Sequence, residues 1–169
     1  MNLPALIISQ AALEQTVKDA ACSPRRRKNL NVHRELAAPV QRLFNAMEPG
    51  TYIRVHRHAR PNGWELMLCM AGHFSVLLFE NDGCVRERID LHAEGPLRGV
   101  EVPPNTWHTV ISRSHGTLMF EVKEGPYQPL DDKDFAPWMP DEASPSTSIA
   151  LQRLESAQPG DYPMGQIAP

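Results

Sequence analysis

The spacing of hydrophobic residues along the chain changes near residue 50. Near the start, apolar residues recur at helical spacing at Ala12, Leu13, Val17 and Ala20. Ser9 stands before them as a candidate N-cap, which predicts an amphipathic helix from Ser9 to about Ala21. A second set with helical spacing precedes Pro49 and Gly50, at Val40, Leu43, Phe44 and Met47. It predicts a second helix.

From residue 52 onward, short β-branched or aromatic segments alternate with Gly, Pro, Asn or Asp. These segments predict strands at 52–56, 65–70, 74–80, 85–91, 99–102, 107–112 and 117–123. Asn81, Asp82 and Gly83 separate two of them and predict a hairpin turn. Because no helical pattern lies between the strands, an antiparallel sandwich or barrel is expected. Inward side chains from separate strands of such a barrel can meet at one point.

The strand pattern fades after residue 127. Phe135, Trp138 and Met139 form an apolar cluster among prolines, and the tail from Ser144 is rich in Ser, Pro and Gln. The tail lacks a clear core face, apart from three residues that suffice for one or two helical turns, Ile149, Leu151 and Leu154. We therefore divide the chain into a helical or extended arm (1–48), a barrel (49–128) and a partly flexible C-terminal extension (129–169).

Composition narrows the class of protein. The chain has 169 residues, a length that suits one domain. Its formal net charge of -3 gives no sign of a nucleic-acid partner. Its three cysteines form no CxxC, so free thiols in the cytoplasm are expected. No segment approaches the roughly 20 apolar residues of a membrane span, and no basic n-region opens the chain. We predict a cytoplasmic protein with no membrane partner.

The run Arg25-Arg26-Arg27-Lys28 has two interpretations. Such runs usually form solvated surface, which is the interpretation that we favour. The alternative is a grip for a phosphate or carboxylate anion.

Three histidines and one glutamate carry the strongest chemical signal. His56 and His58 are separated by one residue, so on a strand both imidazoles point to the same face. Glu65 and His108 follow in segments with strand character. Three imidazoles and one carboxylate suit one divalent ion of iron, manganese, zinc or nickel better than calcium. Four ligands leave positions open on an octahedral ion, where water or substrate can bind.

The metal-ligand spacing also resembles a known family. Gly50-x5-His56-x-His58-x6-Glu65-x6-Gly72 resembles the first cupin motif, and Pro103-x4-His108 resembles the second. The loop before Glu65 is longer than usual, and Asn105 replaces a glycine, although Asn tolerates the left-handed conformation. The resemblance implies an all-β core with a single antiparallel β-barrel or jelly roll (cupin, RmlC-like). A short N-terminal helical segment and an irregular C-terminal extension complete this expected fold.

A closer resemblance, to the WbuC-type cupin-fold metalloproteins, spans about residues 27–142. It is carried by Lys28-Asn29-x-Asn31-x-His33, Gln41-Arg42-x-x-Asn45-Ala46, Trp107-His108-Thr109, Glu121-x-Lys123-x-Gly125-Pro126-Tyr127 and Trp138-x-Pro140. It implies chemistry on a sugar or nucleotide sugar in surface polysaccharide (O-antigen) synthesis. The matched segments nominate Lys123, Tyr127 and His33 as catalytic residues, and Asn29 and Arg42 as substrate-binding residues.

Two further nominations rest on residue type. Trp64, like Tyr127, offers a ring on which a sugar can stack, although such rings at a barrel mouth more often serve packing. Glu121 shares a strand face with Lys123, which fits either an exposed ion pair or a buried acid and base pair.

Three functions stay open. The first is a metal-dependent sugar isomerase or epimerase, the second a non-haem Fe(II) dioxygenase of a small molecule, and the third a non-catalytic cupin that binds a small molecule. In each case the partner is a small molecule such as a sugar or carboxylate. A homodimer is expected, because barrel edges need cover.

Overall fold

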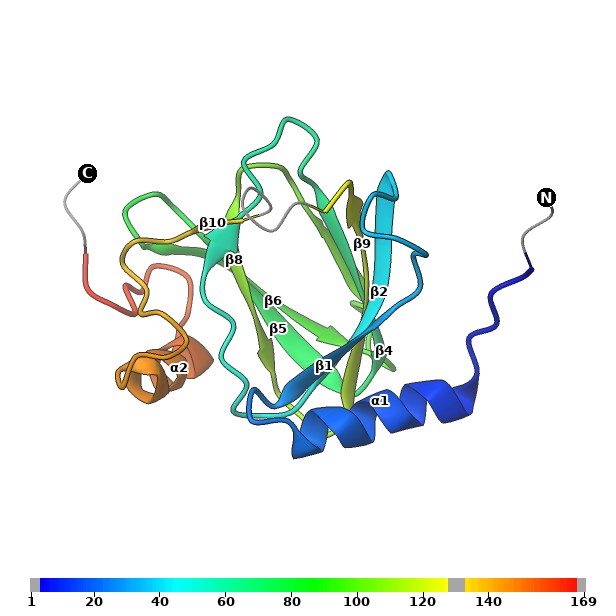
Figure 1. Cartoon of the computed structure of the whole chain (residues 1–169). Helices are drawn as coiled ribbons and strands as arrows, with labels where there is room; N and C mark the ends of the chain where they lie inside the picture. Colours follow the sequence, from blue (N-terminus) through cyan, green and yellow to red (C-terminus); the bar gives the residue numbers. More distant parts are fainter. Residues whose placement is uncertain (1–3, 128–132, 167–169) are drawn as a thin grey trace.

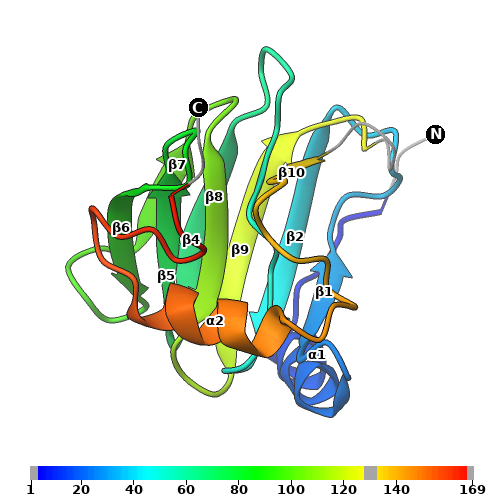
Figure 2. The ribbon, with the colours of Figure 1, turned by 90° about the vertical axis from the view of Figure 1, so that its left-hand side faces the viewer.

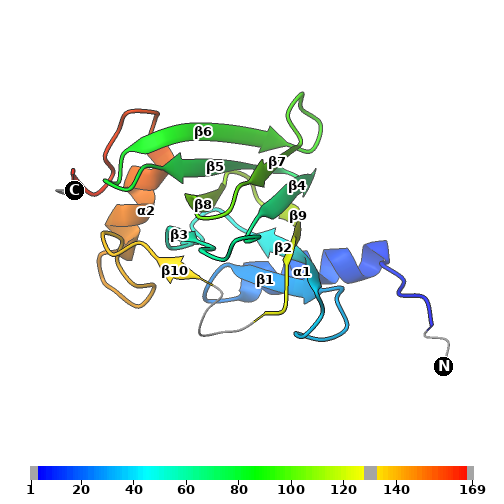
Figure 3. The ribbon, with the colours of Figure 1, turned by 90° about the horizontal axis from the view of Figure 1, so that it is seen from above.

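Ten strands form two facing antiparallel sheets within residues 4–127 and 133–166, which this computed structural model describes (Figures 1 and 3). The first sheet has the order β1 (Arg27–Asn31), β2 (Val40–Met47), β9 (Thr117–Glu124), β4 (Glu65–Ala71) and β7 (Gly99–Val102). The second has the order β10 (Asp134–Phe135), β3 (His56–Arg57), β8 (Trp107–Ser112), β5 (His73–Phe79) and β6 (Val85–His92). The fold is the expected all-β jelly roll.

One helix covers the outer face of the first sheet. α1 (Gln10–Cys22) begins where expected, and the Ala12 N–H donates to the Ser9 hydroxyl at 3.2 Å. α1 contacts β1 and β2, and Figure 1 shows it beside β1 at the lower edge of the molecule. The apolar cluster beneath the helix consists of Ala20, Val32, Phe44, Ala46 and Leu118, with Leu13, Val17, Leu30, Ala71 and Phe120 around it. The helix predicted from Ser9 to about Ala21 is thus confirmed.

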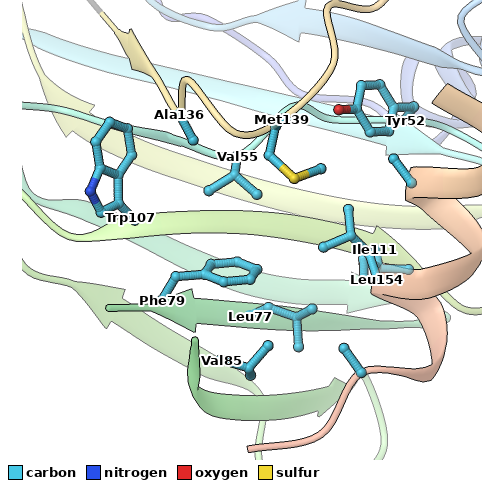
Figure 4. Packing of buried hydrophobic residues seen from close by; sticks show 12 residues of the cluster. Tyr52, Val55, Leu77, Phe79, Val85, Trp107, Ile111, Ala136, Met139 and Leu154 are labelled. Atoms are coloured by element: carbon cyan, nitrogen blue, oxygen red, sulfur yellow. The ribbon is translucent and has the colours of Figure 1, made fainter. Parts of the chain in front are cut away.

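A second helix covers the outer face of the second sheet. α2 (Thr147–Ser156) lies across β5 and β8 (Figure 2), where Leu154 and Ala150 pack against Leu77 and Ile111. Figure 4 shows this cluster, in which Met139 and Ala136 also take part. Part of the C-terminal extension therefore packs on the second sheet and completes a hydrophobic cluster there. Ile149, one of the three apolar residues from which helical turns were predicted, is 54% exposed.

The apolar part of the interior lies between the sheets. Its buried members are Met47, Met67, Cys69, Phe74, Val76, Leu78, Leu91, Val102, Val110 and Met119. The alternation along β9 explains the two layers: Met119 points inward, whereas Leu118 and Phe120 point outward beneath α1.

The predicted second helix is wrong, because residues 40–47 form β2. Val40, Leu43, Phe44 and Met47 fit helical spacing, but β2 is covered on both faces. Phe44 packs outward beneath α1, whereas Met47 packs between the sheets. When both faces carry apolar residues, the period of two disappears from the sequence.

The first predicted strand is also much shorter than expected. Of residues 52–56, only His56 belongs to a strand, since β3 is His56–Arg57. The preceding carbonyl oxygens accept hydrogen bonds outside the ladder: Tyr52 from an Arg27 guanidinium N–H and Val55 from the Ala136 N–H. Arg27 itself belongs to β1, which the basic run concealed.

The other six predicted strands match β4 to β9 within two residues, and 81–83 form the expected turn before β6. The expected boundary at residues 128 and 129 lies outside the described residues. β1 and β2, from the expected arm, are strands of the first sheet. In the described chain, neither helix has the length and apolar character needed to cross a membrane.

Candidate metal centre

The structure brings His56, His58, Glu65 and His108 together in one buried cluster. His56 belongs to β3 and pairs with His108 of β8, His58 follows β3, and Glu65 opens β4. One nitrogen or oxygen atom from each side chain lies within 4.8 Å of the others. Four residues spread over 53 positions therefore converge on one point, as the cupin-like spacing predicts.

Local backbone features hold these side chains in register. Asn105 has φ 59°, so it adopts the left-handed conformation that its place in the second motif requires. Its N–H donates to the His58 carbonyl at 2.8 Å, which ties the turn before His108 to the segment of His58. Gly63 allows the longer loop to pass close by, since a Cβ there would lie 2.7 Å from the same carbonyl oxygen. The two departures from the family pattern are thus accommodated.

Backbone carbonyls fix the tautomers of two histidines. His56 donates from Nδ1 to the Arg54 carbonyl at 2.9 Å, and His108 donates from Nδ1 to the Thr106 carbonyl at 2.8 Å. Each neutral ring then has its lone pair on Nε2. Burial above all, and then the charge of Lys133, holds the pKa of His56 well below its usual value. Its buried Nε2 has no hydrogen-bond partner among the described residues.

Glu65 completes the cluster with a carboxylate. Its Oε2 lies 2.9 Å from His108 Nε2 and 3.5 Å from His58 Nε2. Burial alone would raise the pKa of Glu65, but the adjacent His108 and His58 rings hold its pKa well below its usual value. Without a proton or a cation between them, a carboxylate oxygen and an imidazole lone pair would repel each other at this distance.

The donor set fits a divalent transition metal. It offers imidazole nitrogens and one carboxylate oxygen, and the orphaned His56 Nε2 supplies a lone pair with no other use. The second nitrogen of His56 and His108 is held by a backbone carbonyl, as is usual for ligating histidines.

A cavity of about 640 Å³ adjoins the cluster at His56. That volume is within the range of small-molecule sites. The lining is mainly polar, and its inward residues from the first sheet include Arg27, Asn29, Asn31, Gln41, Asn45, Glu121 and Lys123. From the other side come Ile53, Arg54, His56 and Phe135.

Glu121 and Lys123 form a buried pair on the inner face of β9. Lys123 Nζ lies 3.7 Å from Glu121 Oε1 and 5.7 Å from the centre of the Tyr127 ring. Burial, and then the negative charge of Glu65, raises the pKa of Glu121 to about 8. Sequence alternation placed the two residues on one face but left open whether that face was exposed.

Four of the other nominated residues line the cavity, and two do not. Lys123, Tyr127, His33 and Asn29 are in the lining. The Arg42 side chain is exposed, because it alternates with the inward Gln41 and Leu43 on β2. Arg42 contributes through its backbone, whose N–H and carbonyl both contact His33 Nδ1.

Trp64 is half-buried and lies outside the cavity lining, although it directly precedes Glu65. Its ring therefore does not face the space in which we expected a sugar to stack.

Sequence reasoning missed part of the cavity wall. Arg25 and Arg27, from the basic run, line the cavity and both pair with Glu142. Glu142 and Phe135 belong to the C-terminal extension, where the sequence pattern marks Phe135 only as part of an apolar cluster and does not mark Glu142. The sequence signal that points to the two arginines is the interpretation of the basic run as an anion-binding segment.

Comparison with known proteins supports the fold. A family model described as a domain of unknown function (DUF6016) matches residues 8–91. No curated protein matches the chain. Among solved structures, the capsular polysaccharide assembling protein CapF from Staphylococcus aureus is 18% identical, with a TM-score of 0.53, and the match covers 67% of this chain and 32% of CapF.

Two further structures have similar scores. Protein SO0799 from Shewanella oneidensis is 14% identical (TM-score 0.52), over 64% of this chain and 72% of that protein. Oxalate oxidase with the substrate analogue glycolate is 16% identical (TM-score 0.51), over 68% of this chain and 57% of the enzyme. This chain thus spans about a third of CapF and little more than half of oxalate oxidase. At these identities the likeness establishes a shared jelly-roll fold and leaves activity open.

Proposed function

We propose that this protein holds one divalent transition-metal ion through His56, His58, Glu65 and His108, and is an enzyme acting on a sugar or nucleotide sugar. The observation that carries the proposal is a buried set of four ligand atoms at the wall of a polar cavity. A cation that only stapled the barrel would need no such cavity beside it.

The cavity offers groups for proton transfer and for binding. A bound ion would polarise a carbonyl or hydroxyl oxygen of the substrate. Lys123 is buried beside Glu121, within the lining, where it can exchange a proton with a carbon next to that oxygen. Tyr127, close to the Lys123 ammonium, borders the same space and can pack against a sugar ring.

The place of this reaction in the cell is inferred from the WbuC-type sequence pattern. That resemblance supports a role in surface polysaccharide (O-antigen) synthesis. CapF is named for capsular polysaccharide assembly, but at 18% identity it supports the shared fold only. We also propose a cytoplasmic homodimer: the free thiols Cys22, Cys69 and Cys84 fit a reducing compartment, and outer strands such as β1 leave edges to cover.

Proton exchange tests this function. Protein purified with its own metal is incubated in D₂O with UDP-, dTDP-, GDP- and CMP-linked sugars, and deuterium incorporation is followed by NMR. We expect incorporation at a carbon of one sugar, lost in Lys123→Met and after chelation. Absence of exchange, product and binding across the panel would overturn the sugar assignment.

The same donor set is compatible with iron, which supports a second candidate, an Fe(II) dioxygenase. Substrate-dependent oxygen uptake by iron-loaded protein, without deuterium exchange, would replace the isomerase proposal with this one. Ligand binding without turnover in either assay would leave a non-catalytic binding protein.

A further inference from the structure

Buried polar atoms without partners gather in the lining of the cavity. Within the described residues, four such atoms belong to lining side chains: His33 Nε2, Asn45 Oδ1, Arg54 Nε and His56 Nε2. Leaving a buried polar atom unpaired is costly in free energy, so native proteins keep few such atoms. His56 Nε2 is accounted for by the proposed metal. The other three are not.

Asn45 lies on the inner face of β2, away from the metal ligands. In the ladder it stands opposite Asn29 of β1 on one side and Met119 of β9 on the other. It is 8% exposed, and its neighbours along the same face are Leu43 and Met47. An apolar side chain would suit this position in a core. The amide oxygen is therefore best explained by a donor that enters from the cavity.

His33 presents a second unpaired atom to the same space. The Arg42 N–H and carbonyl lie 3.1 and 2.9 Å from His33 Nδ1, so the backbone of β2 holds the ring. Nε2 is then the nitrogen left for the cavity. Asn45 lies three residues beyond Arg42 on β2, so the two contacts are separated by roughly 10 Å along the strand.

The charge of the lining selects the kind of ligand. Its described residues include six cationic side chains, Arg25, Arg27, Lys28, Arg54, Lys123 and Lys133, and two glutamates, Glu121 and Glu142. Glu142 is shared between Arg25 and Arg27, Glu121 pairs with Lys123, and Asp141, outside the lining, pairs with Arg54. Three carboxylates thus face six cations, and part of the positive charge is not neutralised. An excess of positive charge in a recessed site attracts anions.

We propose that His33 and Asn45 determine specificity by hydrogen-bonding hydroxyl groups of an anionic sugar whose carboxylate or phosphate lies among these cations. The inference deepens the proposed function and rests on it for the sugar class. The amide oxygen of Asn45 accepts from one hydroxyl and His33 Nε2 contacts another. Neither residue touches the metal cluster, so their contribution is separable from metal binding.

Calorimetric titration with matched probes tests this inference. The probes are D-glucuronate, D-glucose 6-phosphate, neutral D-glucose, acetate and inorganic phosphate. We expect glucuronate or glucose 6-phosphate to bind more tightly than glucose, and also more tightly than its matching bare anion, acetate or phosphate. Whichever of the two anionic sugars binds more tightly identifies the preferred anionic group. Asn45→Leu and His33→Leu should each weaken that sugar about tenfold, the effect of one lost hydrogen bond. Their affinity for acetate or phosphate should not change.

Asn62→Leu, the same substitution in an exposed turn, is the matched control and should bind as the parent protein does. Thermal unfolding verifies that each variant is folded, and the two sites give independent readings if one variant is unstable. Unchanged sugar affinity in a folded Asn45→Leu or His33→Leu variant contradicts the inference. A parent protein that binds acetate or phosphate as tightly as the matching anionic sugar also contradicts it.

The titrations are repeated in His108→Ala, which separates this inference from the proposed function. Tenfold effects of Asn45→Leu and His33→Leu that persist in metal-free His108→Ala would show that the anionic-sugar site does not depend on the metal. If the parent protein also carried no metal, the metal proposal would fail and the anionic-sugar site would be retained. One metal ion per chain in the parent protein, lost in His108→Ala, together with no effect of Asn45→Leu or His33→Leu on sugar affinity, would retain the metal proposal and overturn this inference.

Discussion

The space between the two sheets has an apolar half and a polar half. Towards β4, β7, β5 and β6 it is filled by residues such as Phe74, Met67 and Leu91, all buried. Towards β1, β2 and β9 it is a cavity lined by Asn45, Glu121 and other polar residues. The metal cluster lies on the wall of the cavity, at His56.

The difference shows how the strands of the polar half are stabilised although apolar side chains do not fill the space on their inner side. β2 and β9 obtain apolar contact from their outer faces, where the Phe44 and Phe120 rings pack beneath α1 with their centroids 4.8 Å apart. Their inner faces are thereby available for ligand chemistry. Stability and function should then respond to different substitutions, and this separation can be tested.

The largest effect on stability is expected from Phe74→Ala in the apolar half. Phe74 has no exposed surface and lies in the inter-sheet core. The cavity left behind should lower the free energy of unfolding by about 3–5 kcal/mol, as measured by urea denaturation. Metal content per folded molecule should be retained. A loss below about 1 kcal/mol would mean that this half is not the stabilising one.

Leu154→Ala tests whether the C-terminal extension belongs to the fold. Leu154 is buried against the outer face of the second sheet, so truncation should cost about 2–4 kcal/mol by the same measurement. The exposed Ile149 on the same helix supplies the control, because Ile149→Ala should change stability by less than about 0.5 kcal/mol. Equal effects at both positions would show that α2 does not dock as described.

Ser9→Ala should have the smallest effect of the three. The Ser9 hydroxyl accepts the Ala12 N–H at the start of α1, and loss of such a cap costs about 1 kcal/mol. Ser9→Asp, which preserves a cap acceptor, should restore stability. If neither variant differed from the parent in thermal unfolding, the packing of α1 on the first sheet would contribute little to the stability of the polar half.

These halves were not equally visible in the sequence. Six strands and the ligand spacing could be predicted because a period of two and short turns are local signals. β2 could not, since Phe44 and Met47 serve opposite faces and together imitate a helix. β1 was hidden in a basic run, where Arg27 is ordered by Thr51, Tyr52 and Glu142 from distant segments.

The candidate site was predictable only where chemistry leaves a motif. The spacing of the four proposed metal ligands along the sequence is typical of a metal-binding motif; these ligands are His56, His58, Glu65 and His108. Asn45 and Glu142 join the cavity through tertiary contacts that no local pattern records. Arg42 illustrates the converse case, because a residue within a matched segment can have its side chain directed away from this cavity.

Elemental analysis tests the metal assignment most directly. Protein purified without chelators or a metal-affinity column should carry close to one transition-metal ion per chain. His108→Ala should carry almost none while its circular dichroism spectrum is unchanged, and His92→Ala, which alters an exposed histidine on β6, should match the parent. Full metal occupancy in a folded His108→Ala variant would contradict the account.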